Sequence, residues 1–435
     1  MQPERDDDAL WYALAAVALL LSAAAIRWAN LGHSLFEDEV WVASLLRRGG
    51  LRPHTYNIPP LFYGIGRAWV SLRGSSDVAL REPAAAFGVL LGALPFAAPL
   101  SRMTRFLWSA LLLFSSPLLF YSERLKQYTL EASVGTLLII LYLRAQRDDS
   151  MPYWLLFFVV AAASVLVLHT PVFIVIALGV AAFLERRWQR WLACVGVVAL
   201  AGVAYFAYMA PGPESVTLHG DMEVWFSQTG RWINSPAAFF ADSKHWLGHA
   251  FNLTPFWWLL VIPLVALWAL TKRDVTLIAL ATVPPLVAVG ASMLHRYPYG
   301  EVRLMIFCFP PLYLATADAI AAAGRRVPLL LLTPIPFALI GAIREPYNAT
   351  YMRIGDLRTM YAMVAHSAPS EAIYADMSYA APLAYYYPEL RPRIHVGSLH
   401  AIDGPGWYVE RARSFDSRGA GIVIREGDVV AAHVP

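Results

Sequence analysis

Eleven apolar stretches alternate with hydrophilic links along this chain, and that alternation restricts it to a fold with many membrane spans. Hydrophobic residues make up 58% of the 435 residues and charged residues only 15%, so a soluble core would not hide the apolar surface. The stretch from 153 to 184 could form one long helix or two shorter ones. The predicted spans are 10–29, 79–100, 106–121, 128–145, 153–168, 171–184, 190–210, 254–270, 275–294, 303–323 and 327–343.

The links between the spans alternate between rich and poor in Arg and Lys, which predicts the orientation. The positive-inside rule places the basic links in the cytoplasm, so the N-terminus is cytoplasmic and the C-terminus extracytoplasmic. Acidic residues 6–8 precede the first stretch, which favours an uncleaved span. Ala-rich spans and short loops favour a bacterial inner or plasma membrane. The basic links are Arg102/Arg105, Arg144/Arg147, Arg186/Arg187/Arg190, Lys272/Arg273 and Arg325/Arg326.

Three extracytoplasmic segments are longer than a connection requires, and such segments tend to carry chemistry. They are the loops 30–78 and 211–253 and the tail. Cys194 and Cys308 lie inside spans, so no disulfide framework supports these segments. We predict an all-α polytopic membrane domain over 1–345 and a small extracytoplasmic α/β domain over 346–435. In that tail the pattern predicts helices over 357–366 and 379–387 and strands over 372–376, 393–396 and 421–425.

The first outer loop carries the most suggestive chemistry. Glu37, Asp38 and Glu39 stand at the start of an amphipathic stretch that we expect to form a helix along the membrane surface. Acidic residues in a first turn complement the helix dipole, which is one explanation of their presence. The other is that a carboxylate acts there as a general base or a metal ligand.

Two other outer loops hold cations where few are expected, and such cations mark anion sites. Their clustering on the face of Asp38 points to a phosphate. Snorkelling, or salt bridges with Glu123, Glu131 and Glu301, would also explain them. The cations are Arg124, Lys126, Arg296 and Arg303.

Metal binding and nucleic-acid binding have little support. His245 and His249 are spaced to share one helix face, but no third metal ligand is evident, and the metal question stays open. The formal net charge of +3 follows from the cytoplasmic Arg clusters, so no nucleic acid is expected as a partner. The residues require no other cofactor; whether a divalent cation takes part is undecided.

The order of five motifs resembles the GT-C membrane glycosyltransferases, in the branch with protein mannosyltransferases and lipid A aminoarabinose transferase. The resemblance covers about residues 10–345 and implies a sugar donor on a polyprenyl phosphate, with a lipid, glycan or protein as acceptor. The motifs are Asp38-Glu39, Asn57-Ile-Pro-Pro-Leu-Phe-Tyr63, Arg81-Glu-Pro-Ala-Ala-Ala-Phe-Gly88, Tyr121-Ser-Glu-Arg-Leu-Lys-Gln-Tyr128 and Tyr299-Gly-Glu-Val-Arg303.

The resemblance also implies roles for individual residues. Asp38 would be the base toward the acceptor hydroxyl, with Glu39 supporting it or helping to hold a cation. Fixed cations would stabilise the phosphate that leaves, Arg303 first and then Lys126, Arg124 and Arg296. Inversion at the anomeric carbon is implied by the family. The residues expected to line the substrate are His54, Asn57, Tyr128, Tyr299 and Glu301.

The chain departs from the family pattern in two places. Family members commonly show His-Pro-Pro where this chain has Asn57-Ile-Pro-Pro, with His54 three residues earlier. Many relatives read Ser-Gln-Glu-Ala-Arg where this chain has Ser122-Glu-Arg-Leu-Lys-Gln, so the choice between Arg124 and Lys126 stays open. A transporter or flippase of lipid-linked sugars is the alternative function, although it should show paired halves.

Overall fold

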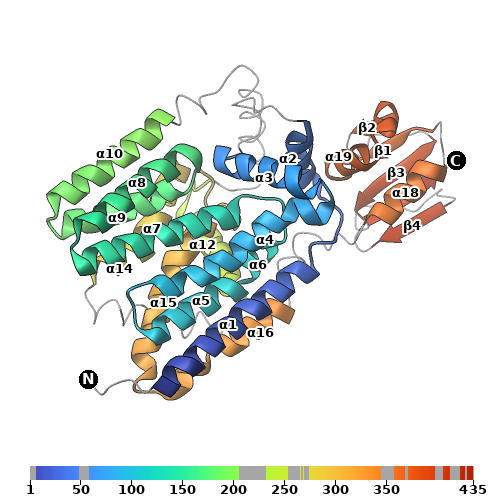
Figure 1. Cartoon of the computed structure of the whole chain (residues 1–435). Helices are drawn as coiled ribbons and strands as arrows, with labels where there is room; N and C mark the ends of the chain where they lie inside the picture. The colour runs from blue at the N-terminus through green and yellow to red at the C-terminus, as the bar shows by residue number, and fades with distance from the viewer. Residues whose placement is uncertain are drawn as a thin grey trace. The chain divides into compact units, whose positions relative to one another are not determined.

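The computed structural model of the chain divides by its internal contacts into two units (Figure 1). The first comprises Met1–Trp28, Arg52–Ile65 and Pro83–Tyr347, and the second comprises Ala29–Leu51, Gly66–Glu82 and Asn348–Pro435. Three stretches far apart in the sequence therefore build the second unit. The structure describes residues 6–48, 58–204, 232–252, 265, 268, 274–343, 357–367, 371–396, 405–411, 422–426 and 429–434.

The first unit is built from helices, most of them rich in apolar residues. Helix α4 begins in the second unit and continues into the first, as does α3 (Pro60–Arg73) in the opposite direction. Short 3₁₀ helices, η1 (Leu94–Ala97), η3 (Ile306–Cys308) and η4 (Pro328–Leu332), lie between the longer ones. The longer helices are α1 (Asp6–Ala29), α4 (Asp77–Ala93), α5 (Arg102–Phe114), α6 (Ser116–Ser122), α7 (Tyr128–Asp148), α8 (Met151–Val167), α9 (Pro171–Leu184), α10 (Trp188–Ala204), α12 (Pro236–Ala250), α14 (Val275–Met293), α15 (Phe309–Gly324) and α16 (Pro334–Ile343).

These helices make the chain an integral membrane protein. In the described part of the chain, five helices are long and apolar enough to cross a membrane, and the bent pair α5–α6 makes a sixth if it counts as one span. The predicted class is thus confirmed. The count of eleven stays a prediction, because the span expected over 254–270 lies outside the described residues except for 265 and 268. The five are Ala9–Ala29, Asp77–Ala97, Tyr128–Asp148, Val275–Met293 and Ile306–Gly324.

The spans differ in how much of their surface the protein covers. In the most apolar window of α1 only 6% of the residues are buried, whereas 83% are buried in that of α7. Leu10, Leu14 and Leu21 of α1 are all exposed. In a bilayer such side chains face lipid, so α1 is a peripheral span and α7 a central one.

The stretch that left one helix or two open forms two helices. Helix α8 ends at Val167 and α9 begins at Pro171, a residue favoured in a first helical turn because it lacks the N–H that would remain unpaired there. Glu131 of α7 pairs with donor groups between the two helices: its carboxylate accepts from His169 N–H at 3.3 Å and from Thr170 Oγ1 at 2.9 Å. Of the two interpretations of 153–184, the one with two helices is confirmed, and their count as two spans stays a prediction.

The span predicted over 106–121 is bent by 60° where α5 meets α6. Ser115 is extended, and Pro117 in the first turn of α6 has no N–H to continue the α5 ladder. The side chain of Asn252 takes up the freed groups, accepting from Ser116 N–H at 2.8 Å and donating to Phe114 O at 3.2 Å. Asn252 is 2% exposed, so these bonds are made inside the protein.

The second unit contains the predicted α/β tail. In its described part a sheet runs in the order β2-β1-β3-β5-β4, with β1 parallel to β2 and β3, and β5 antiparallel to β3 and β4. Helices α18 (Arg358–Ser367) and α19 (Met377–Tyr386) pack on it through Val364 and Leu383. The predicted helices and strands are confirmed, but β3 and β5 were not predicted. The strands are β1 (Ile373–Ala375), β2 (Ile394–Val396), β3 (Gly406–Arg411), β4 (Ile422–Glu426) and β5 (Val429–Val434).

The amphipathic helix of the first outer loop also belongs to this unit. Helix α2 (Glu37–Arg48) begins at the predicted residue and buries Val40, Ala43 and Leu46. It packs against α19, and Arg47 lies over the ring of Tyr385 at 4.1 Å from its centre. The acidic turn at the start of α2 and the tail therefore share one unit.

Candidate active site

Glu39 closes the first turn of α2 on itself. Its Oε2 accepts from Phe36 N–H at 3.1 Å, while Phe36 O accepts from the N–H groups of Glu39 and Val40 at 2.9 Å. A Glu at the third helical position that reaches back to the residue before the helix is half of a capping box. This contact fixes where α2 starts, and with it Asp38, whose side chain is half-buried.

Arg81 of α4 holds the other side of Glu39. Its Nε donates to Glu39 Oε1 at 2.8 Å and its Nη2 to Glu39 Oε2 at 2.7 Å. The remaining N–H groups donate to Leu31 O at 3.0 Å, to Ser34 O at 2.9 Å and to His33 O. All five N–H groups of the guanidinium are thereby used, which is what burial of an Arg demands.

The pair of Arg81 and Glu39 is fully buried, with both side chains at most 2% exposed. A buried cation left without its carboxylate is costly, so the two residues depend on each other. Since Arg81 also binds three carbonyl groups of the segment 31–34, the pair fixes the approach of the chain to α2. Both carboxylate oxygens of Glu39 are thus engaged by Arg81, directly next to Asp38 in the sequence.

The four predicted cations lie on two loops of the first unit, residues 123–127 and 294–305. Arg124 lies over the ring of Phe120 at 4.7 Å, and Lys126 N–H donates to Arg124 O at 2.8 Å. Arg303 lies 3.6 Å from Glu301, which is fully buried, while 24% of the Arg303 side chain is exposed. Arg296 is exposed. A buried carboxylate beside a partly exposed guanidinium orients that cation.

The loop that carries Arg303 is fixed against α12. Tyr299 is hydrogen-bonded to Ser243 at 2.9 Å and is 2% exposed. Burial raises the pKa of Tyr299 above its usual value. Gly300 has φ +89°, and a Cβ there would meet the Cβ of Asp242 at 2.5 Å, so the turn needs glycine. The segment from Tyr299 to Arg303 is therefore a constrained turn.

Tyr297 connects this turn to the start of α7. Burial raises the pKa of Tyr297 well above its usual value, and the nearby Glu131 and Tyr128 add to the effect. Its hydroxyl donates to Leu304 O at 2.6 Å. Tyr128 packs edge-on against Tyr121 at 4.9 Å between ring centres. Tyr297, on the loop of Arg303, therefore lies near Tyr128, which follows the loop of Arg124 and Lys126.

The predicted site residues are distributed over both units. Asp38 and Glu39 belong to the second unit, and the predicted cations, Tyr128, Tyr299 and Glu301 belong to the first. His54 and Asn57 lie outside the described residues. Among the described residues no group of three or more His, Cys, Asp or Glu side chains is placed to hold a metal ion. His245 and His249 lie with their rings 4.7 Å apart.

Sequence reasoning assigned no role to the buried arginines. Arg81 stood in a motif that carried the family resemblance, and Arg27 lay within the predicted span 10–29. Arg27 is fully buried and donates to Ala23 O and Leu113 O, each at 3.0 Å. The signal was available, because a cation within or beside an apolar span requires partners. The partners of these arginines include residues distant in sequence, so they could not be predicted.

Three solved structures show the fold. The chain is similar to ArnT from Cupriavidus metallidurans in the apo state, with a TM-score of 0.61 and 13% identity over 96% of this chain and 97% of that chain. ArnT bound to undecaprenyl phosphate gives a TM-score of 0.57 and 14% identity over the same shares. A third similar structure is the archaeal oligosaccharyltransferase AglB from Archaeoglobus fulgidus, in complex with an inhibitory peptide and a dolichol-phosphate. Its TM-score is 0.53 and its identity 12%, over 94% of this chain and 70% of that chain.

ArnT and AglB are membrane glycosyltransferases of the GT-C fold. The likeness extends over nearly the whole chain, so the chain has the GT-C fold, and the resemblance seen in its motifs is confirmed at that level. The sequence matches no protein-family model and no curated protein.

Proposed function

We propose that this protein transfers a sugar from a polyprenyl-phosphate donor to an acceptor hydroxyl at the extracytoplasmic face of the membrane. The likeness over 96% of the chain to ArnT bound to undecaprenyl phosphate carries the proposal. The acidic turn of α2 supports it, because the chemistry needs a fixed carboxylate and Asp38 stands beside the buried Arg81–Glu39 pair.

In the proposed reaction Asp38 takes the proton of the acceptor hydroxyl as its oxygen attacks the anomeric carbon. The bond from that carbon to the phosphate oxygen breaks, and the polyprenyl phosphate leaves with the electron pair. Asp38 later returns its proton to water. One displacement inverts the configuration at the anomeric carbon, as the family resemblance implies. Glu39 serves as a positioning residue because its carboxylate is already held by Arg81.

Cations stabilise the negative charge that the leaving phosphate gains. We assign this role first to Arg303, because the buried Glu301 orients its partly exposed guanidinium. Lys126 and Arg124 follow, since both are half-buried on the loop before α7, and Arg296 comes last because it is the most exposed of the four. Tyr128, Tyr299 and Glu301 are proposed to line the donor site, together with His54 and Asn57.

We also propose how the protein is organised in the membrane. The protein has eleven spans, a cytoplasmic N-terminus, an extracytoplasmic C-terminus and a boundary between membrane domain and tail near residue 345. The membrane is a bacterial inner or plasma membrane. The sugar is a hexose or a pentose, and the acceptor is a lipid, a glycan or a protein.

The test uses purified protein in lipid, a panel of polyprenyl-phosphate sugars and host membrane extract as acceptor. Release of free polyprenyl phosphate together with labelled sugar on the extract is the expected result, and it identifies the donor. If an intact donor instead appears on the opposite face of sealed vesicles with no release, the protein is a flippase and the transferase proposal is wrong. A vesicle with extract but no protein gives the background.

A further inference from the structure

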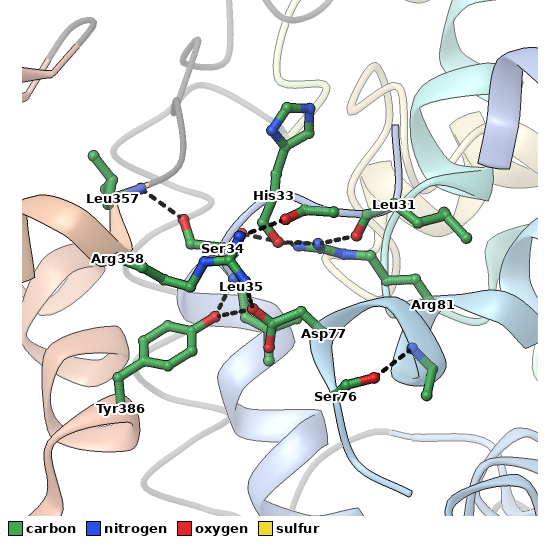
Figure 2. A network of polar contacts seen from close by, with 12 residues as sticks. Leu31, His33, Ser34, Leu35, Ser76, Asp77, Arg81, Leu357, Arg358 and Tyr386 are labelled. Atoms are coloured by element: carbon green, nitrogen blue, oxygen red, sulfur yellow. Dashed lines mark hydrogen bonds and ion pairs between the residues drawn. The ribbon is translucent and has the colours of Figure 1, made fainter. Parts of the chain in front are cut away.

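The hydroxyl of Tyr386 in the tail contacts two segments that lead to the acidic turn (Figure 2). It accepts from Leu35 N–H at 2.7 Å and donates to Asp77 Oδ2 at 2.7 Å. Leu35 precedes α2 by two residues, and Asp77 opens α4, the helix of Arg81. One phenol therefore connects the end of α19 to the segment before α2 and to the start of α4.

Arg358 and Leu357 reach the same segment from the start of α18. Arg358 Nη2 donates to Gly32 O at 2.8 Å, and its Nη1 lies 3.4 Å from Asp77 Oδ2. Leu357 N–H donates to Ser34 Oγ at 3.1 Å. Asp77 is 7% exposed, so its carboxylate meets Tyr386 and Arg358 within the protein and not in bulk water.

The segment 31–36 is consequently held from two sides. Arg81 binds the carbonyl groups of Leu31, His33 and Ser34. The tail binds other polar groups of this segment, namely the Gly32 carbonyl, the Ser34 hydroxyl and the Leu35 amide. An irregular segment has no regular hydrogen-bond ladder of its own, so its shape depends on these partners.

We propose that Tyr386 and Arg358 are positioning residues of the tail, which hold residues 32–36, and through them Asp38, in the geometry that sugar transfer requires. The proposal rests on the proposed function. It gives the tail a task in turnover. Desolvation by burial raises the pKa of the Tyr386 phenol, so the hydroxyl remains a donor to Asp77 while accepting from Leu35.

Tyr385 provides a matched control for Tyr386. Its ring lies under Arg47, which Tyr385→Phe preserves, and its buried hydroxyl has no hydrogen-bond partner among the described residues. Tyr386→Phe removes the same atom but loses both contacts of the network. For the second positioning residue, Arg358→Gln is compared with Arg391→Gln, because Arg391 is exposed and bonds within the tail to Ala384 O.

Two measurements on the full chain in lipid test the proposal. In the first, kcat of sugar transfer should fall about tenfold or more in Tyr386→Phe relative to Tyr385→Phe, as for the two lost hydrogen bonds, with donor binding unchanged and the protein still folded at the assay temperature. The kcat of Arg358→Gln should likewise be lower than that of Arg391→Gln. In the second, hydrogen–deuterium exchange of the Leu35 amide should be faster in Tyr386→Phe than in Tyr385→Phe.

Equal kcat in variants and controls would overturn the positioning role, even with faster exchange at Leu35. A joint loss of donor binding, thermal midpoint and turnover would also overturn it, since the residues would then only support folding. If the wild type transfers no sugar from any donor, the proposed function fails. The exchange measurement would still report whether Tyr386 protects Leu35, which separates the two failures.

Discussion

Arg81 and Glu39, 42 positions apart in the sequence, form a buried ion pair through two parallel contacts of 2.8 and 2.7 Å. The pair connects the start of α4 to the start of α2. Because Arg81 also binds three backbone carbonyl groups, the ion pair shapes the segment that leads to Asp38. The stability of this region and its proposed chemistry therefore share one pair of residues.

Glu39→Gln should destabilise the protein by about 3–5 kcal/mol, because the buried guanidinium of Arg81 would lose its compensating charge. Thermal unfolding in lipid measures the effect. Arg73→Gln is the control: Arg73 pairs with Glu82 at 3.2 Å but its side chain is 60% exposed, so the loss should be much smaller. Equal shifts in the two variants would contradict the importance of burial here.

Asn252→Leu should destabilise the bend between α5 and α6. The Asn252 side chain bonds Ser116 N–H, Phe114 O and Phe337 O, and each buried group left unpaired costs about 1–3 kcal/mol. Thermal unfolding should show a clear loss. Gln127→Leu is the comparison, because the Gln127 side chain makes no cap hydrogen bond to α7. An unchanged midpoint in Asn252→Leu would show that the bend does not need this amide.

Gly300→Ala should weaken donor use without unfolding the protein. A non-glycine residue at φ +89° costs about 1–2 kcal/mol, and its Cβ would collide with Asp242. The turn that carries Tyr299 and Arg303 would shift, which should raise KM for the donor. Gly290→Ala on α14 is the control, since a Cβ there meets nothing within 4 Å. Equal KM in both variants would show that the turn tolerates displacement.

Arg303→Gln should lower the affinity for polyprenyl phosphate about tenfold or more, because a charge-assisted contact to the phosphate would be lost. Binding of labelled polyprenyl phosphate to protein in lipid measures it directly. Arg325→Gln, an exposed arginine of the predicted cytoplasmic face, should bind like the wild type. If Arg303→Gln also binds normally, the donor phosphate lies elsewhere.

The chemistry of the acidic turn could be predicted from the sequence, but its supports could not. Helix α2 begins at Glu37 as predicted, because local spacing determines an amphipathic helix. Tyr386 and Asp77, in contrast, are 309 residues apart, and no local pattern relates a tail phenol to the start of a span. Arg81 was conspicuous as a cation beside apolar residues, but its five acceptors come from tertiary structure.

The missed strands have a physical explanation. Strand β5 contains Ala431 and Ala432, which are poor strand formers, and both are fully buried between β3 and β4. Burial on both faces removes the alternation of polar and apolar residues that identifies a strand. The bend at Ser115 was missed for a related reason: the Asn252 side chain that stabilises it is supplied by a distant helix end.

Turnover by Asp38→Asn tests the central claim most directly. The change keeps the size of the side chain and removes the base, so transfer should fall by at least about a hundredfold while binding of the polyprenyl-phosphate donor is retained. Glu37→Gln, one residue earlier in the same turn, should transfer sugar at close to the wild-type rate. Full transfer by Asp38→Asn would contradict the assignment of Asp38 as the base.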